Sequence, residues 1–359
     1  MVESNVYFTA SLASLIHDIK VGKIVGSYSI SQAMLNHFLS TLNESQWSTA
    51  DELMTIVRET GRICENALPT EAILGNIVRR MLKIIREEYD ELNMPQEQIK
   101  QTDDSQAASL QKLVTQNSEK SVEKSDYKAL YTDLRENLIT HLTEIENELH
   151  LSHDNLAQQA SQHVHSAELI LTLGYSKSVE KFLKSVPKER KFEVVIAECA
   201  PACRGHLLAT SLASSKIDST IIPDSAIYGY MNRVNKVILG THSVLANGGL
   251  RAASGAFTVA LAAKHFSVPV IVLVPMFKMS PVFLFNYEQE AFNLVGSTQS
   301  VLPYNTPVSQ QVKAYSPAFD YVPPKLITLF ISSAGGFTPD YVYRLLAEMY
   351  HPDDYNLTK

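Results

Sequence analysis

The sequence predicts an α/β protein, with an N-terminal helical domain over residues 1–150 and a domain built on a parallel β-sheet over residues 151–359. Three observations lead to this prediction. The chain has 359 residues, which is more than one typical core organises. Apolar residues recur at helical spacing through its first part. After residue 167, short apolar runs alternate with segments suited to helices, as in strands joined by crossover helices.

Each helix of the first domain has its own sequence signal. The residues from Thr49 to Glu52 form an S/T-x-x-E capping box, which predicts a helix start. Pro69-Thr70-Glu71 predicts another start, because proline suits the first turn of a helix. The apolar stripes that would face a common core are Leu12, Leu15, Ile16 and Ile19; Ile73, Ile77, Met81, Ile84 and Ile85; and, after Tyr127, Leu130, Leu134, Leu138, Leu142, Ile145 and Leu149.

Residues 94–125 differ from the helices on either side of them. This segment is rich in Gln, Ser, Asp, Glu and Lys and has few large apolar residues. Such a composition cannot bury enough apolar area to offset the entropy of ordering the chain. We therefore expect a disordered insertion or a loop within the helical domain.

The strands of the second domain are predicted from short apolar runs. These runs cover residues 169–173, 194–197, 220–222, 237–239 and 270–274, with helical segments expected at 179–183 and 205–213. In a parallel sheet of this kind, ligands bind beyond the carboxyl ends of the strands. The residues just after those ends are the first place to look for a functional site.

The stretch 245–264 suggests such a site. Its pattern indicates a strand, a glycine loop, a helix and a further strand, with Gly248, Gly249 and Gly255 where a backbone could approach a ligand at a helix N-terminus. No Asp, Glu, Lys or Cys lies between His242 and Ala263. Only the backbone and Arg251 would be offered to a ligand, so this resembles a binding site without its chemistry.

Composition narrows the classes of function. A net charge of -7 and a pI near 5.9 argue against a nucleic-acid-binding surface. The N-terminal stretch has no uninterrupted apolar core, and no apolar run reaches 18 residues, so we expect neither a signal peptide nor a membrane span. Three cysteines, an odd number, suggest reduced thiols in the cytosol.

The candidate reactive groups each have a simpler alternative. No G-x-G-x-x-G or P-loop lysine is present, so we expect no nucleotide cofactor. His163 and His165 could form a metal pair, but no third ligand accompanies them, which favours ordinary or interface histidines. Asp224 could act as a general base, but we favour a role as a helix cap. Cys199 and Cys203 could carry a reactive thiol, but we favour a role in packing for both.

Several long motifs carry a family resemblance. They are ILTLGYSKSVEKFL, VVIAECAPACRGHLLA, VNKVILGTHSVLANGGLRAASGAFTVALAAKH, PVIVLVPMFKMSP, FDYVPPKLITLFIS and YHPDD. From about residue 126 to 354, the chain resembles the regulatory alpha/beta/delta subunit family of eukaryotic translation initiation factor 2B, and within it the beta pattern. The resemblance implies a helical domain joined to a Rossmann-like domain, and a cytosolic complex that promotes guanine-nucleotide exchange on initiation factor 2.

The same resemblance extends to sugar-phosphate isomerases that act on methylthioribose 1-phosphate or ribose bisphosphate. Their pattern LTHCN has a catalytic cysteine where this chain has Gly174, and their catalytic aspartate is replaced by His242. Ala200 and Leu207 stand where their substrate-binding arginines would be. A non-catalytic subunit is therefore favoured over an isomerase. A degenerate ligand pocket at Gly174, His242, Asn247, Gly248 and Gly249 remains a third alternative.

The resemblance also implies partners. These are the alpha, delta, gamma and epsilon subunits of factor 2B and the alpha subunit of initiation factor 2, whose phosphorylation inhibits exchange in the integrated stress response; neither nucleic acid nor a membrane is implied. The helical segments carry Arg58, Lys83 and Arg86 together with three arginines that we select as the candidate contact with the substrate protein: Arg62, Arg79 and Arg80. The alternative is a solvated helix face. The apolar segment 321–331 is expected to contribute to subunit contacts or to the core.

Overall fold

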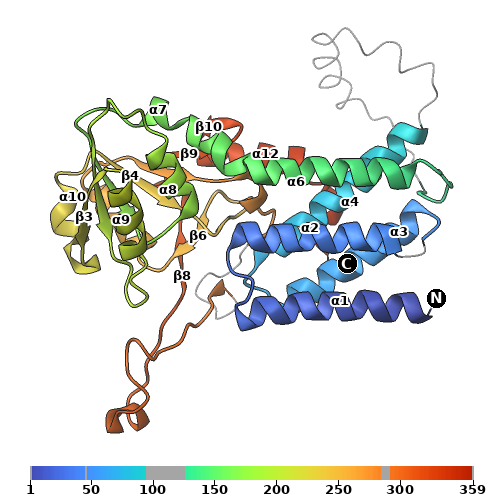
Figure 1. Cartoon of the computed structure of the whole chain (residues 1–359), viewed down its shortest axis with the longest axis horizontal. Coiled ribbons are helices and arrows are strands. Elements are labelled where there is room, and N and C mark those ends of the chain that lie inside the picture. Colours follow the sequence, from blue (N-terminus) through green and yellow to red (C-terminus); the bar gives the residue numbers. More distant parts are fainter. Residues whose placement is uncertain (1, 45–46, 94–125, 284–291, 358–359) are drawn as a thin grey trace.

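The computed structural model describes residues 2–44, 47–93, 126–283 and 292–357. The disordered insertion predicted for residues 94–125 lies outside these residues. Along the long axis of the molecule, the helical part occupies one end and the α/β part the other (Figure 1). No helix within the described ranges is long and apolar enough to cross a membrane.

The helical part is built from long helices that share one apolar core. Met34, Phe38, Leu53, Leu82 and Leu138 are all at most 1% exposed in this core. The helices are α1 (Val2–Val21), α2 (Ser27–Glu44), α3 (Ala50–Ala67), α4 (Ala72–Asn93) and α6 (Leu134–Gln158), whereas the short α7 (Ala160–His163) after α6 packs with the α/β part. The predicted helical domain is therefore present.

Two of the predicted helix starts illustrate how local signals act. The Thr49 hydroxyl accepts a hydrogen bond from the backbone N–H of Glu52 at 3.3 Å, so the capping box begins α3 as predicted. The stripe after Tyr127 begins later than expected. Leu130 is 72% exposed, and α6 begins only at Leu134, because the preceding residues run across the end of α4 as an irregular segment.

The α/β part contains a seven-stranded sheet with the order β10-β9-β7-β4-β1-β2-β3. All neighbouring pairs are parallel except β10 and β9. The five predicted runs become strands, and the sheet also contains two later strands, β9 and β10. The strands are β1 (Leu169–Leu173), β2 (Glu193–Ala197), β3 (Asp218–Ile222), β4 (Lys236–Gly240), β7 (Val270–Leu273), β9 (Leu329–Ser332) and β10 (Gly335–Phe337).

Helices cover both faces of this sheet. On β1, Ile170 packs with helices α8 (Lys177–Lys184) and α9 (Gly205–Ser214), whereas Leu171 faces the opposite layer. Alternate residues of a strand point to opposite faces, so both faces require an apolar cover. The opposite layer contains α10 (Ile227–Met231), α11 (Ala256–His265) and α12 (Val342–Met349).

The glycine stretch folds differently from the prediction. Between β4 and α11 the chain forms an antiparallel hairpin of β5 (Ser243–Val244) and β6 (Leu250–Ala253), and β6 also pairs with β8 (Phe319–Val322). Gly248 and Gly249 turn this hairpin, and only Gly255 lies at the N-terminus of α11. The strand partner β8 comes much later in the chain, so local pattern could not indicate it.

The segment 321–331, expected at subunit contacts or in the core, belongs mainly to the core. Val322, Phe330 and Ile331 are fully buried. The segment just before it behaves differently: residues 293–317 form an arm that projects away from the body (Figure 1). The base of the arm is closed by hydrogen bonds from the N–H of Gly296 to the Ser316 carbonyl and from the N–H of Ala318 to the Leu294 carbonyl, both at 2.8 Å.

Short 3-10 turns complete the chain, and two of them join the parts. They are η2 (Asp224–Ala226), η3 (Met276–Lys278), η5 (Pro307–Gln310), η6 (Pro324–Leu326), η7 (Pro339–Tyr341) and η8 (Pro352–Asp354). Phe277 of η3 and Leu357 beyond η8 both pack into the helical core. The domain boundary predicted at residue 150 stays a prediction, and α6 runs across it.

Candidate functional site

The carboxyl ends of β1 and β4 form the switch point of the sheet, where the chain order reverses and ligands bind in folds of this kind. Gly174 lies there with a φ of +59°, and its N–H donates to the Ala197 carbonyl at 2.9 Å. A Cβ at this position would lie 3.0 Å from Cβ and 3.3 Å from Sγ of Cys199. The Cys199 side chain therefore occupies the space that a side chain at position 174 would need.

The N-terminus of α11 faces the same region and is already occupied. One oxygen of the Asp320 carboxylate accepts hydrogen bonds from the N–H of Gly255 at 2.7 Å and of Phe257 at 3.2 Å. Free N–H groups at a helix N-terminus are what bind a phosphate. Here the protein supplies its own anion, so a phosphorylated ligand would have to displace Asp320.

The glycine loop is packed as well. A Cβ on Gly249 would lie 2.7 Å from the Tyr321 ring, and one on Gly248 would lie 2.8 Å from the Pro339 carbonyl oxygen. Asn247 accepts from the N–H of Gly249 and donates to the Tyr321 hydroxyl, both at 2.9 Å. These glycines allow close packing of β8 and η7.

His242 points toward the helical part. Its Nε2 lies 3.4 Å from Oε2 of Glu71, the residue before α4, and its ring is 4.6 Å from the Phe319 ring. Burial raises the pKa of Glu71, but His242 and Arg251 lower it by more, so it lies below the ordinary value. Arg251 is also buried and donates to the Thr70 carbonyl at 2.7 Å. His242 and Arg251, which the sequence suggested would face a ligand, thus connect the α/β part to the helical part.

The structure places the remaining reactive candidates in ordinary roles, with one correction. Burial raises the pKa of the Cys199 thiol to about 11, which fits a packing cysteine. The carbonyl of His163 accepts from Lys236 at 2.5 Å, and the His163–His165 pair gathers no third ligand among the described residues.

Asp224 was predicted to cap a helix. Its carboxylate instead accepts from the N–H of Cys199 at 2.9 Å and of Ala200 at 2.7 Å.

Arg79 is the main correction to the predicted contact surface. Its side chain is 2% exposed, pairs with Glu65 at 2.7 Å and donates to the carbonyl of Tyr355. Arg86 is also buried, and it donates to both carboxylate oxygens of Asp354. Helix α4 is covered on most of its circumference, so these arginines anchor the C-terminal tail to the helices and cannot form an exposed contact.

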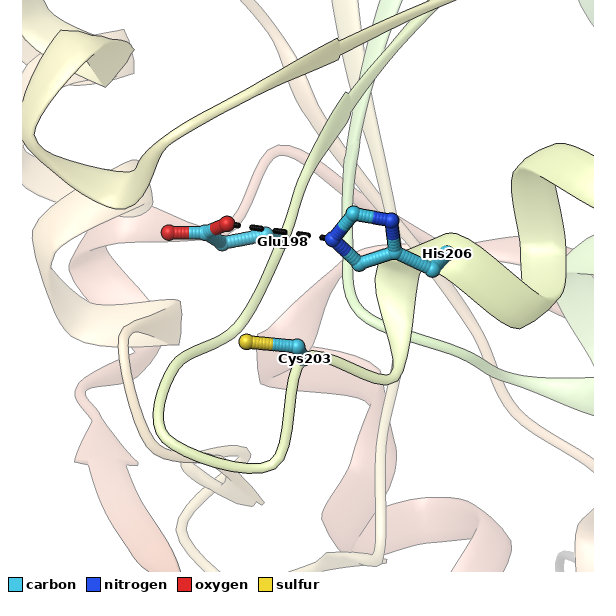
Figure 2. Close-up of side chains that lie close together, drawn as sticks. All are labelled: Glu198, Cys203 and His206. Carbon is cyan, nitrogen blue, oxygen red and sulfur yellow. Dashed lines mark ion pairs between the residues drawn. The ribbon is translucent and has the colours of Figure 1, made fainter. Parts of the chain in front are cut away.

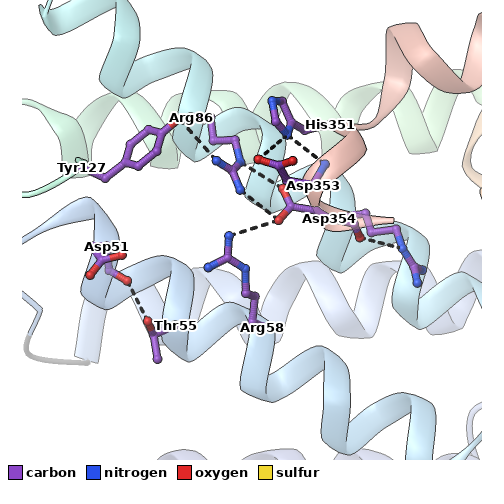
Figure 3. Close-up of polar contacts among 9 residues, drawn as sticks. Asp51, Thr55, Arg58, Arg86, Tyr127, His351, Asp353 and Asp354 are labelled. Carbon is purple, nitrogen blue, oxygen red and sulfur yellow. Dashed lines mark hydrogen bonds and ion pairs between the residues drawn. The ribbon is translucent and has the colours of Figure 1, made fainter. Parts of the chain in front are cut away.

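Arg62 and Arg80 remain accessible. The Arg62 side chain is 53% exposed and pairs with Glu59 one turn earlier. The Arg80 side chain is 25% exposed, pairs with Glu148 and lines a cavity of about 390 Å³ between α4, α6 and α12. Arg58 is partly exposed and shares the Asp354 carboxylate with Arg86 (Figure 3). The candidate contact is thereby reduced from three arginines to two.

Three features that matter here carried little signal in the sequence. Asp320 and Asp354 act on residues far away in the chain, so nothing near them indicated their partners. The arm could have been suspected from its composition, because Lys313 is the only charged residue from 292 to 319. Seven of its apolar side chains are between 49% and 61% exposed: Leu294, Val295, Val301, Tyr304, Val308, Val312 and Tyr315.

Comparisons with known proteins agree with the resemblance. A family model described as the initiation factor 2 subunit family matches residues 23–339. The chain is 37% identical to translation initiation factor eIF2B subunit beta of Dictyostelium discoideum, over 95% of each chain. It is 34% identical to the Schizosaccharomyces pombe protein of the same name, over 96% of each. It is 27% identical to ribose 1,5-bisphosphate isomerase of Archaeoglobus fulgidus, over 60% of this chain and 68% of that protein.

Solved structures show the same relationship. The crystal structure of eIF2B beta from Chaetomium thermophilum has a TM-score of 0.74 and 25% identity, covering 97% of this chain and 94% of that one. A chain of the tetrameric eIF2B beta2-delta2 complex from the same organism has a TM-score of 0.70 and 25% identity, covering 96% and 95%. The α/β fold with its helical N-terminal region is confirmed by both.

Proposed function

This chain belongs to the initiation factor 2 subunit family, and from that premise we propose that it is a non-catalytic regulatory subunit of a translation initiation factor 2B complex. In that role it assembles with alpha, delta, gamma and epsilon subunits in the cytosol. The complex promotes GDP/GTP exchange on initiation factor 2 and is inhibited when the alpha subunit of that factor is phosphorylated. The observation that carries the proposal is the likeness to beta subunits along almost the whole of both chains.

The exposed apolar surface supports an assembly role. The arm presents seven partly exposed apolar side chains and a single charge. Phe257 and Leu261 lie one turn apart on α11, which packs against the helix α10 that carries the exposed Tyr228. Large exposed apolar patches are rare on monomeric proteins, and where they occur they commonly mark protein–protein interfaces. The beta relative crystallised as a beta2-delta2 tetramer, so we propose a delta-type subunit as the partner that covers the arm.

One observation supports the alternative function of an isomerase, namely the likeness to the Archaeoglobus enzyme over 60% of the chain. The switch-point region argues against it, because Gly174 offers no proton-carrying group and Asp320 occupies the N-terminus of α11. General acid–base catalysis needs a titratable group at the reacting atoms. His242, which stands where those enzymes have their catalytic aspartate, is directed at Glu71 in the helical part.

We therefore expect the purified chain to give no turnover of ribose 1,5-bisphosphate or methylthioribose 1-phosphate above a blank without protein. The Archaeoglobus isomerase, assayed in parallel, serves as the positive control for ribose 1,5-bisphosphate. Calorimetric titration of the chain with ribose 1,5-bisphosphate should also give no binding heat, since the anion site is filled. Turnover that is lost in a His242→Ala variant would refute the non-catalytic proposal.

The two accessible arginines test the proposed contact with initiation factor 2. Charge reversal in Arg62→Glu or Arg80→Glu turns an attraction into a repulsion at an interface, and we expect each to weaken binding of initiation factor 2 by about tenfold, or ~1.4 kcal/mol. Binding of the phosphorylated and unphosphorylated forms is measured in the assembled complex. A regulatory contact changes the ratio of the two affinities, whereas a general contact lowers both.

A matched control uses Arg233→Glu, which reverses an exposed arginine in the α/β part. Arg79 is left unchanged, because a variant of that buried residue would test folding and not recognition. Should Arg62→Glu and Arg80→Glu both leave the two affinities within about twofold, ~0.4 kcal/mol, as Arg233→Glu is expected to do, these arginines belong to an ordinary solvated face.

A further inference from the structure

The loop between β2 and α9 brings together three side chains that commonly bind metal ions. Glu198 follows β2, Cys203 lies in the loop, and His206 is in the first turn of α9. One donor atom from each, namely a carboxylate oxygen, a thiol sulfur and an imidazole nitrogen, lies within 4.8 Å of the other two. Figure 2 shows the Glu198 carboxylate directed at the imidazole of His206, with Cys203 on the same loop.

The backbone of this loop is held in place without any metal. The N–H of Gly205 donates to the Glu198 carbonyl at 3.0 Å, and the N–H of Cys203 donates to the Cys199 carbonyl at 2.9 Å. A Cβ on Gly205 would lie 2.8 Å from the Ala197 carbonyl oxygen, so only glycine lets the helix start this close to the strand end. The Asp224 carboxylate accepts hydrogen bonds from the N–H groups of Cys199 and Ala200 and so fixes the first part of the loop.

The three donor groups are available to a ligand. Within the part of the chain that the structure describes, they make no side-chain hydrogen bond or ion pair outside the cluster. Inside it, the contact between Nε2 of His206 and Oε2 of Glu198 is 3.9 Å long, and the His206 side chain is 57% exposed. An exposed pair at that distance contributes little to stability, so stability does not explain the arrangement.

We propose that Glu198, Cys203 and His206 bind a divalent transition-metal ion of the zinc type, with water in the remaining position. A thiolate, a carboxylate and a neutral imidazole carry a total charge of −2, which matches a divalent ion, and all three are zinc ligands in proteins. Donor atoms around one tetrahedral zinc ion are about 3.5 Å apart. Rotation of the partly exposed side chains closes the observed separations to that value. Binding replaces the proton on Sγ of Cys203, so one proton is released.

The two cysteines of this loop do not act together. Sγ of Cys199 is directed at the Ser254 carbonyl at a distance of 3.5 Å, away from the cluster around Cys203. Cys199 is therefore a matched control for Cys203: a cysteine of the same loop whose thiol lies outside the cluster. The proposal is independent of the regulatory function proposed above.

The test uses the full chain, stripped of metal with a chelator and then titrated with Co²⁺ as a spectroscopic substitute for zinc. We expect one equivalent to bind with a thiolate-to-metal charge-transfer band, and Zn²⁺ to displace it. Cys203→Ser should abolish the band, whereas Cys199→Ser should retain it. His206→Gln and Glu198→Gln should each weaken Zn²⁺ binding by at least about tenfold, measured by competition with a chromophoric chelator.

Two outcomes would overturn the proposal. One is the absence of a thiolate-to-metal charge-transfer band when the full chain is titrated with an excess of Co²⁺. The other is a band that survives Cys203→Ser, or Zn²⁺ affinity that is unchanged in His206→Gln. Far-UV circular dichroism of each variant shows whether it folds. If Cys203→Ser does not fold, the His206→Gln variant still tests the proposal, because the His206 side chain is exposed.

Discussion

Replacing Asp354 with alanine is expected to lower the free energy of unfolding of the helical part by about 3 to 5 kcal/mol. The Asp354 side chain is fully buried and accepts hydrogen bonds from Arg86 at 3.0 and 3.1 Å and from Arg58 at 3.2 Å (Figure 3). Removing it leaves the buried Arg86 without a counter-charge. An uncompensated buried charge has a far larger effect than the loss of an exposed ion pair.

The neighbouring residue provides the control. The Asp353 side chain is 58% exposed and lies 4.0 Å from His351, so Asp353→Ala should change stability by less than about 0.5 kcal/mol. Urea denaturation followed by circular dichroism compares the two variants with the unmodified chain. A loss below about 1 kcal/mol for Asp354→Ala would show that the tail does not anchor the helices.

The second large effect is expected at the arm. In the double variant Val301→Asp/Val308→Asp, two charges enter a surface that we propose is buried against a delta-type subunit. Each carboxylate buried without a partner costs at least about 2 kcal/mol, so affinity should fall by about three orders of magnitude. The fold should be unaffected, because both valines are 52% exposed in the single chain.

The assembly of co-expressed subunits measures this effect. Light scattering of the purified material gives the mass of the complex, and circular dichroism verifies the fold of the variant. Leu130→Asp, at an apolar position of the helical part that is 72% exposed, is the control and should assemble normally. Normal assembly of the arm variant would place the interface elsewhere, with Tyr228, Phe257 and Leu261 as the next surface to test.

The sequence indicated those elements whose signals are local. Helix α3 starts at its capping box, and the five apolar runs became strands of the main sheet, because periodicity and capping act over a few neighbouring residues. The hairpin of β5 and β6 escaped prediction, since it is held by β8, a strand much later in the chain. The same residues read alone resembled a loop leading into a helix.

The site was predictable to a smaller extent. Gly174 and His242 could be selected from the sequence, but their surroundings depend on Cys199 and Glu71, which reach them only in the folded chain. Two adjacent arginines show most clearly what the sequence alone could not predict: the Arg79 side chain is 2% exposed, whereas the Arg80 side chain is 25% exposed. The partner of Arg86 is 268 positions away, so spacing alone could not separate buried arginines from accessible ones.

We propose that this chain works as a subunit of a factor 2B complex and not as an isolated catalyst. The most direct measurement is to tag the chain at its natural locus, purify it under native conditions and identify the proteins that co-purify by mass spectrometry. We expect alpha-, delta-, gamma- and epsilon-type subunits in stoichiometric amounts, with initiation factor 2 in smaller amounts. Recovery of the chain as a monomer without these subunits would contradict the claim.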